Sequence, residues 1–284
     1  MEAPGTSAIP LGVRLQFARA SVQVIAERSG IRLLHIKGDT VDPSIRSHVR
    51  AGSDVDVLID PVAVPRMHAE LVRHGWRVYS TFLDGSPFGH AQTYHHPDWG
   101  YLDLHRRFPG IRLPDRRAFE VLWAGHGVHD AVGVPCAVPS LDVQVVLLML
   151  NAARDVRAVG AEGRRVWQAQ SPEERARRQA LIRELRAEVP FAVTMGELDR
   201  LRGRREHLLW KTIAEGGSRG AEWWGRVLAA RNPLEAMQTL LRAPLANRSM
   251  LAHKLGRDPT ALEMATATLR RFGAGIRSLV GRRG

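Results

Sequence analysis

The sequence is poor in cysteine and lysine and has no long apolar run. Its single cysteine, Cys136, excludes an internal disulfide framework and any multi-cysteine zinc site. The most apolar stretch, residues 143–150, is far shorter than the roughly 20 residues that a membrane-spanning helix needs. Residues 1–10 lack both a basic stretch and an apolar core, so they do not resemble a signal peptide. We therefore expect a cytoplasmic protein that does not associate with a membrane.

The overall composition indicates a globular chain with a buried core. Apolar residues make up 44% of the 284 residues and charged residues 25%, which excludes disorder as the main state. The length allows one large domain or two ordinary ones. No internal repeat and no low-complexity tract is present.

Basic residues are concentrated in the second half of the chain. Residues 1–150 carry 15 basic and 15 acidic side chains, whereas residues 151–284 carry 26 and 14, so this half accounts for the whole net charge of +12. Only three basic residues are lysines, and an arginine bias often reflects GC-rich coding. The asymmetry itself indicates two regions with different roles, of which the second faces an anionic partner.

The first half alternates between helical and strand periodicity. Gly75 and the turn residues 97–100 mark a helix end and a hairpin. The patterns predict helices over residues 12–28, 64–74 and 115–123, a short helix or turn over 39–48, and strands over 31–36, 55–59, 76–82, 91–95, 101–105 and 134–138.

After Ser140 the periodicity is helical throughout. We expect an apolar, buried helix from Ser140 to about Arg154, a loop over 159–170, capping boxes at 171–174 and 194–197, and further helices over 221–230, 233–242 and 260–280. These patterns divide the chain into an α/β domain with a small mixed sheet, residues 1–139, and an all-helical basic domain, residues 140–284.

Three aspartates on two predicted strands form the most informative pattern. Asp54 and Asp56 are two residues apart, so both side chains lie on one face of their strand, while Val55 and Val57 face the core. Asp103 lies between two leucines on another strand. Adjacent carboxylates repel each other, and a divalent cation is the usual compensation. An isolated Asp-x-Asp pair is more often only a solvated face, but the third aspartate favours a site for two Mg²⁺ ions.

Three motifs together resemble a known family. They are Lys37-Gly38 at the end of a strand, Arg50-x-x-x-Asp54-Val55-Asp56, and Asp103-Leu104-His105. This set resembles the nucleotidyltransferase superfamily that includes DNA polymerase beta, and most closely its bacterial group of uncharacterised nucleotidyltransferases. The resemblance covers about residues 30–110. The wider superfamily usually has Gly-Ser at the end of the first strand, where this chain has Lys37-Gly38-Asp39.

The resemblance implies transfer of a nucleoside monophosphate from a nucleoside triphosphate (NTP), with Mg²⁺ as the cofactor. It implies that Asp54, Asp56 and Asp103 are the catalytic and metal-binding residues, and that Asp103 can take the proton of the attacking hydroxyl. The implied nucleotide- and phosphate-binding residues are Lys37, Gly38, Arg50, Ser53 and His105.

The sequence leaves the acceptor open. The first hypothesis is a hydroxyl or phosphate of a small molecule or peptide, as in natural-product biosynthesis. The second is RNA, as in the tRNA-modifying toxins of the superfamily, and the third is a degenerate protein that binds nucleotide without catalysis. The intact set of three aspartates argues against the third hypothesis.

Other candidate residues have simpler explanations. Zinc binding by the histidines near the predicted hairpin is disfavoured, since His95 and His96 point to opposite faces of one strand. Trp223 and Trp224 are either core residues or an exposed aromatic wall. The arginines over 175–186 and 200–205 are expected to be solvated, with an anion-binding wall as the alternative. Cys136 is expected to be buried.

Overall fold

The computed structural model describes residues 9–46, 52–82, 88–155, 160–242, 251–252, 255 and 257–280. Contacts divide the chain into two compact units. The sheet unit comprises residues 1–81, 90–108 and 114–144, and the helical unit comprises 82–89, 109–113 and 145–284. Two short segments of the first half therefore belong to the helical unit.

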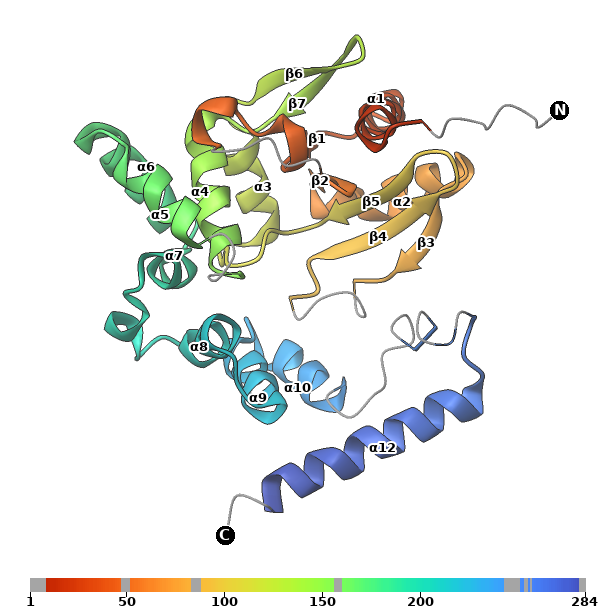
Figure 1. Cartoon of the computed structure of the whole chain (residues 1–284), viewed down its shortest axis with the longest axis vertical. Coiled ribbons are helices and arrows are strands. Elements are labelled where there is room, and N and C mark those ends of the chain that lie inside the picture. The colour runs from red at the N-terminus through yellow and green to blue at the C-terminus, as the bar shows by residue number, and fades with distance from the viewer. Residues whose placement is uncertain are drawn as a thin grey trace, which may run out of the picture. The chain divides into compact units, whose positions relative to one another are not determined.

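In its described residues the sheet unit contains a five-stranded sheet, a two-stranded sheet and three complete α-helices (Figure 1). Its elements are α1 (Leu11–Arg28), β1 (Leu33–His35), β2 (Asp54–Ile59), α2 (Val64–Arg73), β3 (Arg77–Ser80), β4 (Ala91–His96), β5 (Gly100–His105), α3 (Asp115–Trp123), β6 (Gly127–Ala131) and β7 (Val134–Val138). The strand order is β1-β2-β5-β4-β3, in which only β2 and β5 are parallel. The expected small mixed sheet is confirmed.

One face of the five-stranded sheet is covered by α1 and α2. Strand periodicity sends Val55, Val57, Leu102 and Leu104 to this face, where they form one buried cluster with apolar residues of both helices. The intervening residues of β2 and β5 lie on the opposite face, and these include the three aspartates.

The helical unit contains most of α4 (Leu141–Ala152) and, within the described residues, the helices that follow it (Figure 1). These are α5 (Gly160–Gln168), α6 (Pro172–Glu184), α7 (Glu188–Met195), α8 (His207–Glu215), α9 (Arg219–Ala229), α10 (Pro233–Arg242) and α12 (Ala261–Val280). The first residues of α4 belong to the sheet unit, and the helix is buried along most of its length. No helix within the described residues is long and apolar enough to cross a lipid bilayer.

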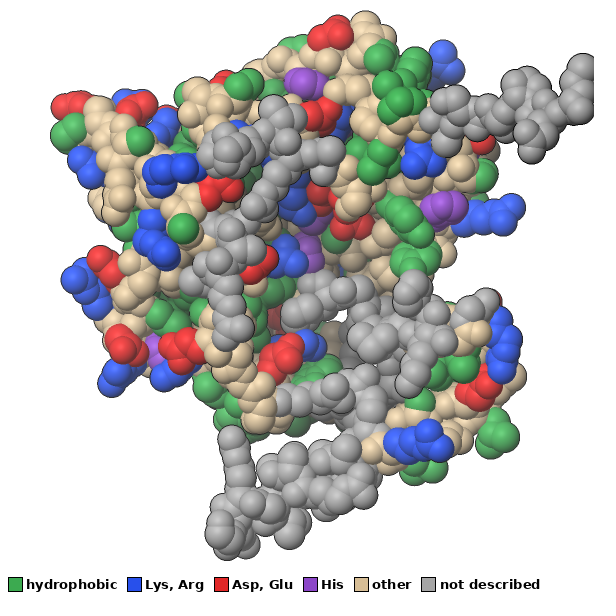
Figure 2. Space-filling model, viewed as in Figure 1, with side chains coloured by type: hydrophobic (Ala, Val, Ile, Leu, Met, Phe, Trp, Pro, Cys, Tyr) green, Lys and Arg blue, Asp and Glu red, His purple; other side chains and the backbone are tan. Residues whose placement is uncertain are grey.

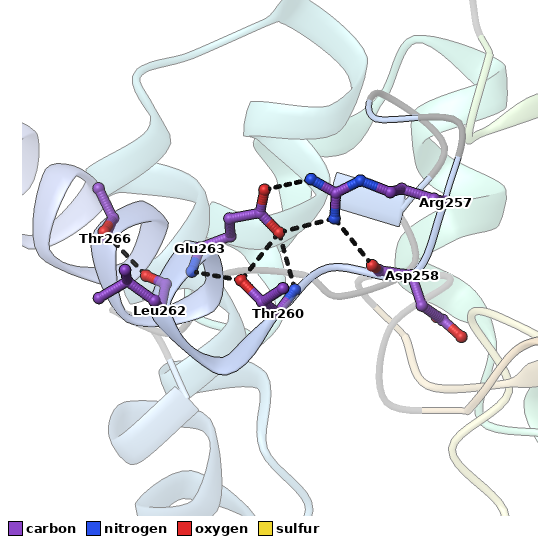
Figure 3. Close-up of polar contacts among 6 residues, drawn as sticks. All are labelled: Arg257, Asp258, Thr260, Leu262, Glu263 and Thr266. Carbon is purple, nitrogen blue, oxygen red and sulfur yellow. Dashed lines mark hydrogen bonds and ion pairs between the residues drawn. The ribbon is translucent and has the colours of Figure 1, made fainter.

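Capping residues set the starts of two helices, and the sequence predicts the first of these caps. Ser171 and Glu174 form the reciprocal capping box of α6. At the start of α12, Thr260 and Glu263 bond reciprocally, and Arg257 donates two hydrogen bonds to Glu263, at 3.0 and 2.6 Å (Figure 3). The hydrogen bond from Arg257 lowers the pKa of Glu263 to about 2.

Several sequence predictions are wrong in this part of the chain. Residues 160–168 form α5 rather than a loop, because Gly163 lets this helix pack closely on Ala152 and Thr194. Thr194 does not begin a helix; it lies in the last turn of α7, which ends at Gly196 with a φ of +77°. Arg178 is not solvated, since only 2% of its surface is exposed and it lies 3.5 Å from Glu174. Helices α7 and α8 and strand β6 were not predicted.

Candidate functional site

The register of β2 and β5 brings the acidic residues together. Asp56 is paired with Asp103 across the parallel strands, Asp54 with Tyr101, and Leu58 with His105. Residues two apart on a strand share a face, so Asp54, Asp56, Asp103 and His105 all lie on the face opposite the α1–α2 core. This parallel pairing of two strands distant in sequence creates the site.

Asp56 lies at the centre of the cluster. Its Oδ1 accepts hydrogen bonds from Lys37 Nζ at 2.5 Å and from His105 Nε2 at 2.8 Å. Burial alone would raise the pKa of Asp56, but the ammonium of Lys37 and the hydrogen bond from His105 outweigh it, so this pKa lies below its ordinary value. Asp56 is therefore ionised throughout the physiological range.

His105 is buried beside Asp56 and is neutral. Its burial and the nearby charge of Lys37 lower its pKa, although Asp56 and Asp103 act in the opposite direction. Since a carboxylate can only accept, Nε2 of the neutral ring carries the proton and donates to Asp56. This hydrogen bond orients the carboxylate of Asp56.

Asp54 and Asp103 flank Asp56 and are half-buried. Asp103 accepts a hydrogen bond from Thr93 Oγ1 at 2.6 Å, and Asp54 accepts one from Ser53 Oγ at 3.1 Å. Burial, together with the negative charges of Asp56 and Asp103, raises the pKa of Asp54 to about 6. Asp54 thus lies where additional positive charge would be stabilising.

The donor set of this cluster fits a divalent metal. Candidate ligand atoms of Asp56, Asp103 and His105 lie within 4.8 Å of one another, and Asp54 lies two residues before Asp56 on the same face of the sheet. Carboxylate oxygens suit hard cations such as Mg²⁺ and Mn²⁺. Burial is the largest cause of the raised pKa of Asp54, and the negative charges of Asp56 and Asp103 raise it more than the charge of Lys37 lowers it.

A glycine turn adjoins the carboxylates on the side of β1. Residues Gly38–Thr40 form one 3₁₀ turn after β1, and Gly38 has a φ of +72°, which disfavours any other residue. A Cβ on Gly52 would lie 3.8 Å from the Cα of Gly38 and 3.4 Å from the carbonyl oxygen of Asp54. Because neither glycine has a side chain, the Gly38 turn and the backbone just before Asp54 can lie close together.

An aromatic row adjoins the carboxylates on the opposite side, toward β4 and β3. The ring centroids of Tyr101 and His95 are 4.9 Å apart, and Tyr79 contacts Tyr101 edge to face at 5.2 Å. Tyr79 and Tyr101 are exposed. His96 instead contacts the core residue Trp76, as expected if His95 and His96 point to opposite faces.

The structure thus gathers most of the predicted site residues. Asp54, Asp56, Asp103, Lys37 and His105 form one cluster, with Ser53 bonded to Asp54 and Gly38 in the adjoining turn. Arg50 lies outside the described residues. Cys136 is buried, as predicted, and burial raises its pKa to about 11.

Two residues near the site were missed, Arg19 and Thr93. Arg19 lies on the buried face of α1 with only 1% of its surface exposed. Its signal in the sequence is a charge among the apolar positions of a predicted helix. Thr93 had no signal, because its hydrogen bond to Asp103 depends on the register of β4 with β5.

Comparisons with known proteins give distant structural similarities only. No family model matches the sequence, and no curated protein matches it. Among eight matching solved chains, the antibiotic-resistance factor ANT(2'')-Ia is 14% identical, with a TM-score of 0.38, over 68% of this chain and 97% of that one. An antigenic nucleotidyltransferase-like protein from Paracoccidioides brasiliensis is 13% identical, with a TM-score of 0.35, over 72% and 93% of the two chains.

A tRNA-processing enzyme in its apo form is 12% identical, with a TM-score of 0.27, over 89% of this chain and 78% of that one. One of these three structures is described as nucleotidyltransferase-like, which is the family that the sequence motifs resemble. Because all three TM-scores are below 0.5, the function proposed below is argued from the site.

Proposed function

We propose that this protein is a Mg²⁺-dependent nucleotidyltransferase that moves a nucleoside monophosphate from an NTP to a hydroxyl or phosphate of a small molecule or peptide. The observation that carries this proposal is the set of three carboxylates on one face of the sheet, beside a glycine turn and a lysine. In this proposal Asp54, Asp56 and Asp103 hold the metal, which would neutralise the charge on the phosphates.

The protein residues have separable roles in this reaction. The acceptor oxygen bonds to the α-phosphorus, the bond from that phosphorus to the bridging oxygen breaks, and pyrophosphate leaves. Asp103 takes the proton of the acceptor hydroxyl. Lys37 and the backbone of the Gly38 turn bind the phosphates, with Ser53 beside Asp54, and His105 keeps Asp56 oriented.

The two flanks of the carboxylates differ, which suggests where each substrate lies. The glycine turn on the β1 side suits phosphates, whereas the row on the β4 side offers aromatic rings. We place the triphosphate on the β1 side and the acceptor beside Tyr101.

The substitution Tyr101→Leu tests this placement. It is expected to leave the affinity for NTP within about twofold of the wild type in calorimetry, and Tyr101→Phe, which keeps the ring, serves as control. A loss of about tenfold with Leu alone would instead place the NTP base on the aromatic row.

The first test is Mg²⁺-dependent binding of the four NTPs by calorimetry. We expect the wild type and the control Asp98→Asn, an exposed carboxylate that lies outside the cluster, to bind at least one NTP, and Asp54→Asn with Asp56→Asn to bind none. A screen for transfer of α-³²P label then follows with the donor identified. Failure of the folded wild type to bind any NTP would contradict the proposal.

RNA is the second candidate acceptor, and the +12 net charge favours it. Three exposed arginines after α7 are, however, already paired: Arg200 with Glu197, Arg202 with Asp199, and Arg204 with Glu188 at 3.9 Å. Figure 2 shows basic and acidic side chains interspersed over this part of the chain. Label transfer to tRNA that weakens with salt would favour RNA over a small acceptor.

A further inference from the structure

A buried arginine of α1 holds the residue that follows Gly38. Arg19 Nη2 lies 2.6 Å from Asp39 Oδ1, and the amide of Gln16, one turn earlier on α1, donates to Asp39 Oδ2. Both oxygens of this carboxylate are thus bound by one helix. Asp39 is the only acidic partner of Arg19 among the described residues.

The guanidinium of Arg19 also lies directly against the glycine turn. A Cβ on Gly38 would lie 3.1 Å from Arg19 Nη2. Nε and Nη1 of Arg19 are buried without a hydrogen-bond partner in the described part of the chain. Hydrogen bonds within α1 therefore do not explain why the guanidinium of Arg19 is buried here. Its contacts with Asp39 and with the Gly38 turn do.

Asp39 needs compensation if this turn binds phosphate. A carboxylate next to phosphate oxygens repels them, and in partly buried surroundings the repulsion is weakly screened. Here the side chain of Asp39 is bound to α1 and its charge is matched by that of Arg19.

Resting on the function proposed above, we propose that Arg19 is a positioning residue of the triphosphate site. It neutralises Asp39, draws that carboxylate toward α1, and so keeps the Gly38 turn free for the phosphates of an NTP. Helix α1 thereby contributes to substrate binding without touching the substrate.

A double-mutant cycle tests this inference. Calorimetry with Mg²⁺ and inorganic tripolyphosphate, and with the NTP that binds best, is carried out on the wild type, Arg19→Met, Asp39→Asn and the double variant. We expect Arg19→Met to weaken both ligands about tenfold, corresponding to about 1.4 kcal/mol. Asp39→Asn should stay within about threefold of the wild type, and the double variant should recover to the level of Asp39→Asn.

Controls separate a binding role from a stability role. Arg32→Met removes another arginine of the sheet unit, one that pairs with Glu120, and should leave affinity unchanged. Mn²⁺ binding in the absence of phosphates should be equal in all variants, because the carboxylates are intact. Recovery of affinity on adding Asp39→Asn is a result that simple loss of packing at Arg19 would not produce.

The outcomes distinguish this inference from the proposed function. If the wild type binds neither ligand, the proposed function fails. If the wild type binds and Arg19→Met binds equally well, or if Asp39→Asn does not restore affinity, only the role of Arg19 is overturned. If Arg19→Met does not fold, Arg19→Lys is used in its place, and its affinity for both ligands is expected to fall about threefold. If the variant that combines Arg19→Lys with Asp39→Asn shows the same loss of affinity, the inference is also overturned.

Discussion

Asp54 and Asp56 are two residues apart on the same strand, yet their surroundings act on them in opposite directions. Asp56 is compensated by Lys37 and His105, which lower its pKa, whereas burial and two neighbouring carboxylates raise that of Asp54 to about 6. In the metal-free protein, the ionised carboxylate of Asp56 therefore stabilises the folded state, whereas the ionised carboxylate of Asp54 destabilises it.

Asparagine substitutions should show this contrast. At pH 8 in EDTA, Asp54→Asn should raise Tm by about 2 °C, because it removes an unfavourable charge. Asp56→Asn should lower stability by about 1–3 kcal/mol, because it removes the negative charge beside Lys37 and leaves Lys37 and His105 a weaker, neutral acceptor. Thermal unfolding followed by circular dichroism measures both.

The pH dependence provides the control. Asp54 has an ordinary pKa of 3.8 and a pKa of about 6 in the folded protein, so between these pH values the folded protein binds more protons than the unfolded chain. The destabilisation of the folded state by Asp54 therefore grows as pH rises through this window. The Tm gain of Asp54→Asn should accordingly vanish near pH 4. Equal shifts for both variants at pH 8 would contradict the assignment.

The affinity for a divalent metal should also depend on the protonation of Asp54. A proton on Asp54 competes with the metal, so Mn²⁺ affinity should be nearly constant above pH 7 and fall by about tenfold per unit below pH 6. Electron paramagnetic resonance of free Mn²⁺ measures this dependence. Affinity that stays constant down to pH 5 would show that Asp54 is not a ligand.

Among the helices, α6 offers the clearest test of local structure. Ser171→Ala removes the side chain that accepts from Glu174 N, so stability should fall by about 1 kcal/mol. Ser171→Asp retains an acceptor at this position and should restore most of the loss in urea unfolding. A neutral alanine variant would mean that packing alone fixes the start of α6.

Local signals in the sequence predicted most elements of the fold, because capping residues and periodicity act within a few positions. Residues 115–123 and 233–242 are helical with the predicted bounds, and residues 134–138 form the predicted strand. Strand β6 escaped prediction because most of its residues are exposed and lack an apolar face. In α5, tertiary packing around Gly163 overrides weak helix propensity.

The candidate site divides in the same way. The same-face placement of Asp54 and Asp56 follows from strand geometry, and the motifs singled out Asp103 and His105. The direct pairing of Asp56 with Asp103 depends on which strands are neighbours, and no local pattern encodes that. The ion pair of Arg19 with Asp39 likewise joins a helix to a turn that the sequence alone does not place together.

At the scale of the whole molecule, the two units are not consecutive pieces of the chain. Segments 82–89 and 109–113 belong to the helical unit, where Phe88 contacts Trp210, and the backbone N–H groups of Arg112 and Leu113 donate to Leu185. The predicted division of the chain into 1–139 and 140–284 would separate these segments from their partners.

A fragment ending at residue 144 is therefore expected to fold poorly. It retains the whole sheet unit but loses the contact of Phe88 with Trp210 and the hydrogen bonds from the N–H groups of Arg112 and Leu113 to Leu185. We expect it to be aggregated, or to lack dispersed amide signals in an NMR spectrum, whereas the full chain is well folded. A soluble fragment that binds Mn²⁺ as tightly as the full chain would contradict this expectation.

The parallel pairing of β2 with β5 also has a consequence for the order of folding. The β4–β5 hairpin closes a short loop and can form early, whereas β2 must find β5 across a long intervening segment, which is entropically costly. Asp103 joins Asp54 and Asp56 only through this non-local step. The repulsion among these carboxylates then opposes the pairing of β2 with β5. A divalent cation present during refolding should therefore accelerate this pairing and increase the rate at which the protein folds.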